Sequence, residues 1–158
     1  MIDVDPYALV KLLHILSSTV LFGTGIGTAF SMLLAHRDGR PAIVARVAAQ
    51  VVAADWFFTT PAVIVQPVSG FALLHLAGFA LDEFWILCSL ALYAVAGAAW
   101  LPVVVIQRRM RDLARAAEMA GTPLPPAYHR LFRRWFLLGW PGFAAVIGIF
   151  VLMVLKPF

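Results

Sequence analysis

Apolar residues fill four long stretches of the chain, which cover residues 7–35, 42–76, 84–106 and 132–155. Each stretch exceeds the roughly 20 residues that an α-helix needs to cross the hydrocarbon of a bilayer. Apolar and polar residues do not alternate with the period of two that marks membrane β-strands. The pattern therefore predicts an all-α fold, an integral membrane four-helix bundle, with residues 1–158 forming one transmembrane domain.

The segments between these stretches predict how the helices are joined and bent. Pro61 and Pro67 fall inside the second stretch and predict a kinked second helix, because each proline removes a backbone donor. Residues 107–119 continue a helical pattern, Gly121 is a typical helix stop, and a Pro-rich turn follows. Residues 128–135 are amphipathic. We therefore expect an amphipathic hairpin between the third and fourth helices, either lying on the membrane surface or docking a cytoplasmic partner.

Basic residues are distributed unevenly among the connections, and this predicts the orientation. All ten arginines lie in the first connection, in the third connection or close to them. The N-terminus carries Asp3 and Asp5, and the second connection carries Asp82 and Glu83. Arginine-rich loops stay in the cytoplasm, so we expect both termini to face outward (N-out/C-out). The expected location is the bacterial inner (cytoplasmic) membrane.

Composition agrees with a membrane protein and excludes other classes. The chain is 63% hydrophobic and 13% charged, about half of the ~25% charge of soluble domains. The net charge of +4 does not indicate nucleic acid as a partner, because the basic residues lie beside apolar spans where topology and anionic lipid account for them. The single cysteine, Cys88, excludes an intrachain disulfide.

Asp55 is the strongest single-residue signal inside a predicted span. It lies nine residues past Arg46, which corresponds to a depth of ~13 Å along a helix. Ionisable groups inside the hydrocarbon are usually functional or paired. We therefore treat Asp55 as a candidate proton-handling residue. The alternative is a protonated side chain that hydrogen-bonds to a neighbouring helix.

Four basic side chains are predicted to gather at the outer rim. Counting along the helices from the arginines places His14, Lys11 and Lys156 at the outer edge of the hydrocarbon, and His75 should emerge at the same face. Histidines from two helices at one height suit the two axial positions of a haem. Lys11 or Lys156 would then pair with the haem propionates. The other interpretation is that these are ordinary interfacial side chains.

Several strings resemble a bacterial family of predicted integral membrane proteins with no assigned function. They are residues 7–16, residues 23–30, Asp55-Trp56, Gln66-Pro67, residues 100–102, Trp140-Pro141 and Lys156-Pro157. More distantly, Lys11 and His14 opening the first span, with His36 closing it, are similar to HemJ-type protoporphyrinogen oxidases and their haem-binding relatives. That resemblance implies that His14 is a haem ligand. It does not extend to oxidase activity, because the arginine that the family carries late in this span is missing here.

These observations favour b-type haem bound near the outer face by His14 and His75, with electron transfer to a quinone or a periplasmic redox carrier. A second hypothesis is a non-catalytic subunit or assembly factor of a larger membrane complex, and a homo-oligomer is compatible with either. A third is transport of a small solute or metal through a path formed by Asp55, Gln66 and the broken second span. Whether the protein is an enzyme is left open by the sequence.

Overall fold

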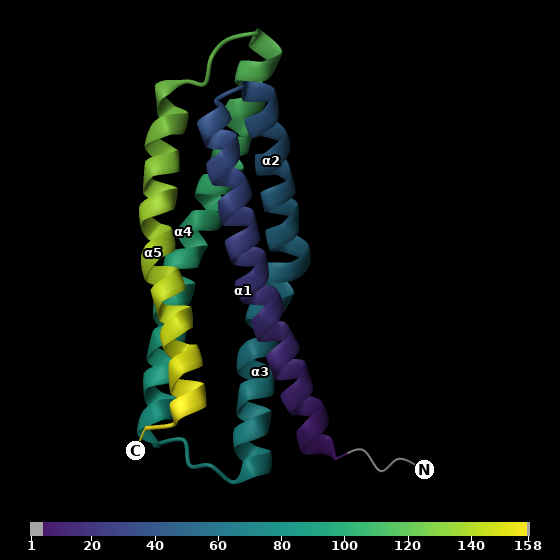
Figure 1. Ribbon diagram of the computed structural model, residues 1–158, viewed down its shortest axis with the longest axis vertical. Helices are drawn as coiled ribbons and strands as arrows, with labels where there is room; N and C mark the ends of the chain where they lie inside the picture. Colours follow the sequence, from purple (N-terminus) through teal and green to yellow (C-terminus); the bar gives the residue numbers. More distant parts are fainter. Residues whose placement is uncertain (1–4, 158) are drawn as a thin grey trace.

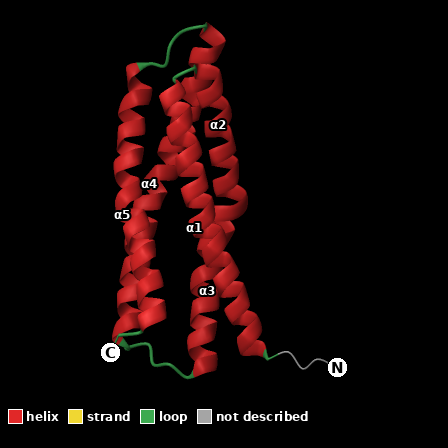
Figure 2. Cartoon of the chain, in the orientation of Figure 1, coloured by secondary structure: helices red, strands yellow, loops and turns green. Residues whose placement is uncertain are grey.

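The structure, a computed structural model, describes residues 5–157, so Asp3 lies outside the described part. These residues form the helices α1 (Pro6–Asp38), α2 (Pro41–Ala54), α3 (Thr60–Ala77), α4 (Phe84–Ala120) and α5 (Pro126–Leu155), with a π-helical turn, η1 (Asp55–Thr59), between α2 and α3. Figure 2 shows that only short loops join the helices. Because α2, η1 and α3 are continuous, the described residues contain four helices long and apolar enough to span a membrane. The predicted all-α four-helix architecture is confirmed.

Local sequence signals set the helix ends. The Asp5 side chain accepts a hydrogen bond from the backbone N–H of Tyr7 at 3.1 Å, and Pro6 occupies the first turn of α1, where a missing N–H costs nothing. At the other end, Gly39 closes α1 with a φ of 75°, a left-handed conformation that glycine adopts without steric cost. Gly121 ends α4 in the same way, with a φ of 63°, as its sequence context predicts.

The helices pack differently at the two ends of the molecule. At one end, the last turns of α1, all of α2, the second half of α4 and the first turns of α5 pack together. Towards the other end, α1 runs with α3 on one side and α4 runs with α5 on the other, as Figure 1 shows. Among the contacts that join these pairs, Tyr93 donates a hydrogen bond to the carbonyl of Val63, and Phe22 meets Phe143 and Phe150 edge-on.

Exposed large hydrophobic side chains stop at one level on every helix. The exposed residue closest to this level is Leu34 on α1, Trp56 in η1, Val105 on α4 and Phe136 on α5. Beyond that level, Met119 is the exposed exception among the described residues, and all ten arginines lie there. The apolar lengths that remain, residues 9–34, 56–76, 84–105 and 136–155, match the ~20 residues that cross a bilayer. We infer that this level is the membrane–water boundary.

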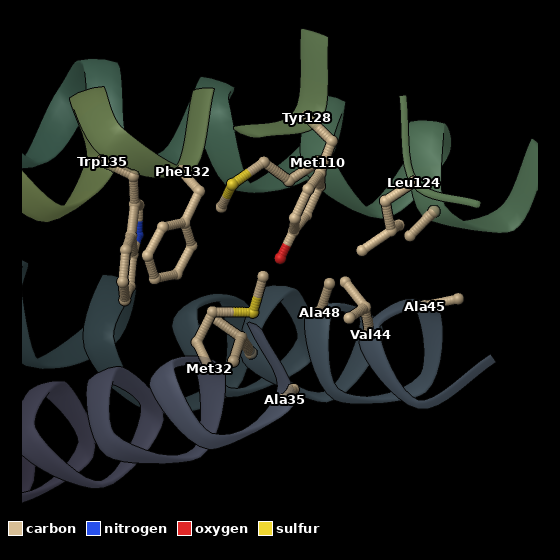
Figure 3. Packing of buried hydrophobic residues seen from close by; sticks show 12 residues of the cluster. Met32, Ala35, Val44, Ala45, Ala48, Met110, Leu124, Tyr128, Phe132 and Trp135 are labelled. Atoms are coloured by element: carbon tan, nitrogen blue, oxygen red, sulfur yellow. The ribbon is translucent and has the colours of Figure 1, made fainter. Parts of the chain in front are cut away.

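We call residues 35–54 and 106–135 the projecting region and the apolar lengths the membrane region. In the projecting region, α4 continues for 13 residues after Gln107, which is a length of ~20 Å. Its core is well packed, as Figure 3 shows: Met110, Val44 and Tyr128 are fully buried, Ala48 is nearly so, and Met32 from the adjoining turn of α1 joins the same cluster. This arrangement is expected if water surrounds it, since the hydrophobic effect drives burial in water and not in lipid.

The expected amphipathic hairpin is present, and it projects beyond the spans as a continuation of α4 and α5. Residues 107–119 and 128–135 do not lie flat on the membrane, because they continue the spans α4 and α5 directly and bury Met110, Ala114, Tyr128 and Phe132 in the core. The sequence pattern was amphipathic because one face packs on α1 and α2. Val44 and Val51 of α2 are likewise buried in this core, so the large exposed apolar side chains of the second span begin at η1.

Candidate functional site

Asp55 lies at the centre of a buried polar network at the membrane boundary. Its Oδ1 accepts a hydrogen bond from the Thr59 hydroxyl at 3.0 Å. With the Gln107 amide oriented to satisfy both of its neighbours, its nitrogen donates to Asp55 Oδ2 at 2.6 Å and its oxygen accepts from Trp135 Nε1 at 3.2 Å. All four side chains are buried. The network therefore joins η1, α4 and α5.

A local departure from α-helical geometry positions Asp55 and Thr59. The backbone N–H of Thr60 bonds to the carbonyl of Asp55, five residues back, and widens this turn into a π-helix. Pro61 follows directly and has no N–H to continue the α-helical ladder. The proline that predicted a kink is thus accommodated by a π-turn, which turns both polar side chains inward while Trp56, Phe57 and Phe58 stay exposed.

The Asp55 network is closed. Both carboxyl oxygens have donors, and the Gln107 amide has a partner at each end. Hydrogen bonds to a charged group contribute roughly 1.5–3 kcal/mol each, and leaving a buried partner unpaired costs about as much. The exposure boundary also lies close to Asp55, so its side chain is nearer to water than the count from Arg46 indicated. This arrangement favours a structural clamp, and proton handling by Asp55 stays a prediction.

A second polar network joins α1 to α3 in the membrane region. His14 Nδ1 lies 2.8 Å from Ser69 Oγ. The Gln66 amide nitrogen donates to the His14 carbonyl at 2.9 Å and lies 2.7 Å from Ser17 Oγ. The helices approach closely here, since a Cβ at Gly70 would lie 3.4 Å from His14 Cε1. The ring of His14 is therefore fixed against α3.

This second network ends in a ring nitrogen of His14 that has no hydrogen-bond partner among the described residues. The Ser69 hydroxyl donates to the carbonyl of Val65 at 2.6 Å, so its oxygen is left to accept the proton of His14 Nδ1. That assignment leaves Nε2 as an unprotonated nitrogen. Among the described residues, Nε2 has no hydrogen-bond partner and is not one of the buried unpartnered atoms. An imidazole held through one nitrogen with the other open is the usual arrangement of a metal-binding histidine.

The other predicted rim residues do not join His14. His75 is exposed; it lies six residues beyond Ser69, which advances α3 by ~9 Å and turns it by roughly 240°. Lys11 is exposed, with its Nζ 5.6 Å from the centre of the Tyr7 ring. Lys156 Nζ lies over the rings of Phe79 and Trp85, at 4.8 and 5.4 Å from their centres.

The residues present fit a haem in part. His14 offers the required nitrogen and an orienting partner, and Lys11 lies one turn away on the same helix. His75 leaves α3 on a different side from the face that holds His14, so the two imidazoles do not face one iron from opposite sides. Gln66 and Asp55, expected along one transport path, lie in two separate networks.

Sequence reasoning identified Asp55 and His14 but missed most of their partners. Residues 107–119 and 128–135, which contain Gln107 and Trp135, were assigned to the amphipathic hairpin. The signal that could have found Gln107 is the buried spacing of residues 107, 110, 114 and 117, which marks one helix face. His36, which closes the first span, stacks on Phe132 with ring centres 3.5 Å apart. No group of three or more metal-binding side chains occurs within residues 5–157.

Four apolar helices, a sharp exposure boundary and ten arginines on one side of it define an α-helical integral membrane protein. More particularly, the chain belongs to the family of predicted integral membrane proteins DUF2269, whose model matches residues 8–157. No curated protein and no solved structure matches the chain.

Proposed function

We propose that this protein binds b-type haem through His14 and transfers electrons at the membrane face opposite the arginines. The observation that carries the proposal is the open Nε2 of His14, whose Nδ1 is held by Ser69 at 2.8 Å. Histidine is the usual axial ligand of b-type haem. A hydrogen bond on the other ring nitrogen fixes the tautomer and raises the basicity of the ligand atom.

The residues around His14 each have a stated task in this proposal. Ser69 orients the ring, and Gln66 holds the backbone of His14 in place through its carbonyl. Lys11 supplies a cation for a propionate, because among the described residues its ammonium has no ion-pair partner. A bound haem b would supply a reversible one-electron couple. His75 has no role at this iron.

The proposed orientation places the haem outside the cytoplasm, at the face that carries both termini. The positive-inside distribution of arginine supports it. At that face a periplasmic redox carrier or a membrane quinone is the expected electron partner. Both lie within reach of a haem at the outer edge of the hydrocarbon. The location that follows is the bacterial inner membrane.

An absorption spectrum of protein purified after expression with ample haem tests the proposal. We expect a Soret band in the wild type and in His75→Ala, and none in His14→Ala. Ser69→Ala should bind haem ~10–100-fold more weakly, the usual effect of removing a partner of a ligand. A monodisperse wild-type protein without a Soret band would overturn the proposal, and so would an unchanged band in His14→Ala.

A further inference from the structure

Four arginines lie at one height along α4 and α5, at the membrane boundary. Arg108 and Arg109 directly follow Gln107 on α4, and Arg133 and Arg134 directly precede Trp135 on α5. Gln107 and Trp135 share a hydrogen bond of 3.2 Å, so the two arginine pairs are at the same height. All four arginines are exposed, and α4 and α5 pack against each other along their length. We call these four residues the boundary arginines.

The protein itself does not neutralise the boundary arginines. The ion pairs within residues 5–157 are Arg40 with Asp38, at 2.7 Å, and Arg111 with Asp112, at 2.8 Å. The hydrogen bond from Arg40 to Asp38 also raises the pKa of the Arg40 guanidinium above its usual value. Asp112, the carboxylate nearest to Arg108 and Arg109 in sequence, is thus already held by Arg111. Four positive charges therefore face the headgroup layer without an internal partner.

Exposed apolar side chains continue below the boundary arginines towards the membrane centre. On α4, Leu101 and Val105 lie seven and three residues before Arg108, and on α5, Leu137 and Trp140 lie four and seven residues after Arg133. Residues at these spacings share one face of a helix. Leu101 and Trp140 are 64% and 65% exposed. Each helix thus presents one boundary arginine, Arg108 on α4 or Arg133 on α5, in line with an apolar stripe.

We propose that the boundary arginines bind a phospholipid with two phosphates, of the diphosphatidylglycerol type. Arginine binds phosphate through two parallel hydrogen bonds, so the pair on each helix suits one phosphate. The apolar stripes on α4 and α5 accept the acyl chains. A lipid with one phosphate would leave the second arginine pair without a counter-charge. Basic sites at the ends of membrane helices are known to select such headgroups.

A second basic surface on the projecting region lies outside this site and serves as its control. A shallow groove of about 480 Å³ between α2 and α4 is lined by Arg46 and Arg115, with Glu118 beside them. Arg46 is nine residues from Asp55 and Arg115 is eight from Gln107, so both lie ~12–13 Å beyond the boundary. That exceeds the headgroup layer, which adds only ~5–7 Å to each side of the hydrocarbon.

Native mass spectrometry of the purified protein in mixed micelles tests the site. The micelles contain phosphatidylethanolamine, phosphatidylglycerol and cardiolipin, and cardiolipin is the diphosphate probe. We compare the wild type with Arg109→Gln/Arg133→Gln and with Arg46→Gln/Arg115→Gln, which removes the same charge from the groove. Losing two boundary arginines should weaken cardiolipin retention about thirtyfold, whereas the groove variant should retain it.

Several results would overturn the proposal. One is a wild-type protein that retains phosphatidylglycerol as well as cardiolipin. Another is an equal loss in the two double variants, which would indicate net charge and not a site. Displacement of cardiolipin by inorganic pyrophosphate at equal concentration would remove the role of the apolar stripes. Circular dichroism and size exclusion confirm that each variant is folded, and a melting temperature that rises with added cardiolipin in the wild type alone is the second measurement.

Discussion

The projecting region and the membrane region use the same residue types in opposite ways. Phe132 in the projecting region is 8% exposed and stacks on His36, whereas Phe57 in the membrane region is 70% exposed. Water surrounds the first region and drives its apolar side chains inward. Lipid surrounds the second and leaves its helices to associate by close packing and hydrogen bonds. The membrane region is therefore arranged as two helix pairs, and the packed core of the projecting region joins all the helices.

The two polar networks, one in each setting, differ in whether they leave an atom without a hydrogen-bond partner. The Asp55 network lies where the projecting region begins, and every one of its atoms that needs a partner has one. The His14 network lies between two helices of the membrane region and leaves Nε2 free. A closed network fixes helices relative to one another. An open one can take a ligand.

The largest expected difference in the free energy of unfolding is between the same substitution, phenylalanine to alanine, made in each of the two regions. Phe132→Ala removes a buried ring and should lower the free energy of unfolding by ~3–5 kcal/mol. Phe57→Ala removes a ring that faces lipid and should change it by less than ~0.5 kcal/mol. Chemical denaturation of both variants in the same detergent measures the difference. Equal losses would contradict the division into two regions.

Breaking the closed network should have an intermediate effect. Gln107→Leu leaves Asp55 Oδ2 and Trp135 Nε1 without their partner, so we expect a loss of ~1–3 kcal/mol in the free energy of unfolding. Gln50→Leu makes the same change on the exposed side of α2 and is the control. A Gln107→Leu variant as stable as its control would show that the hydrogen bonds to Gln107 do not clamp α4.

The smallest effect is expected where one hydrogen bond links the two helix pairs. Tyr93→Phe removes only the hydroxyl that bonds to the carbonyl of Val63. The expected loss of stability is ~0.5–1.5 kcal/mol, and faster amide exchange on α3 near Val63 should accompany it. Tyr7→Phe, at a half-buried position outside this contact, serves as the control. Unchanged exchange in the Tyr93 variant would mean that the pairs are held by other contacts.

The sequence predicted the membrane region better than the projecting region. The outer ends of the helices follow from hydropathy, because the apolar stretches stop where the helices stop. The ends on the arginine side do not follow from hydropathy, because α4 and α5 continue there as amphipathic helices. Their arginines lie on the surface of the bundle, and Met110 and Phe132 lie in its core. Amphipathicity is the same for a helix on a membrane surface and for one in a bundle. Only the packing of α2 against α4 distinguishes them.

The candidate site was predictable in its central residues and not in their partners. Asp55 and His14 stand out because ionisable side chains are rare in apolar stretches. Their partners Gln107, Trp135 and Ser69 lie far away in sequence, and only the tertiary arrangement of the helices brings them together. The rotation of α3 between Ser69 and His75 likewise decides that the two histidines face different directions, which a count of residue heights cannot provide.

Labelling of single cysteines in membrane vesicles tests the position of the boundary most directly. In a Cys88→Ser background, Ala42→Cys lies on the projecting region and Ile64→Cys on the membrane region. Ile64 is 61% exposed in the protein, so only lipid can protect a cysteine placed there. We predict that a membrane-impermeant maleimide labels Ala42→Cys rapidly when the arginine side is accessible and leaves Ile64→Cys unlabelled. Protection of Ala42→Cys on both sides of the membrane, or rapid labelling of Ile64→Cys, would contradict the account.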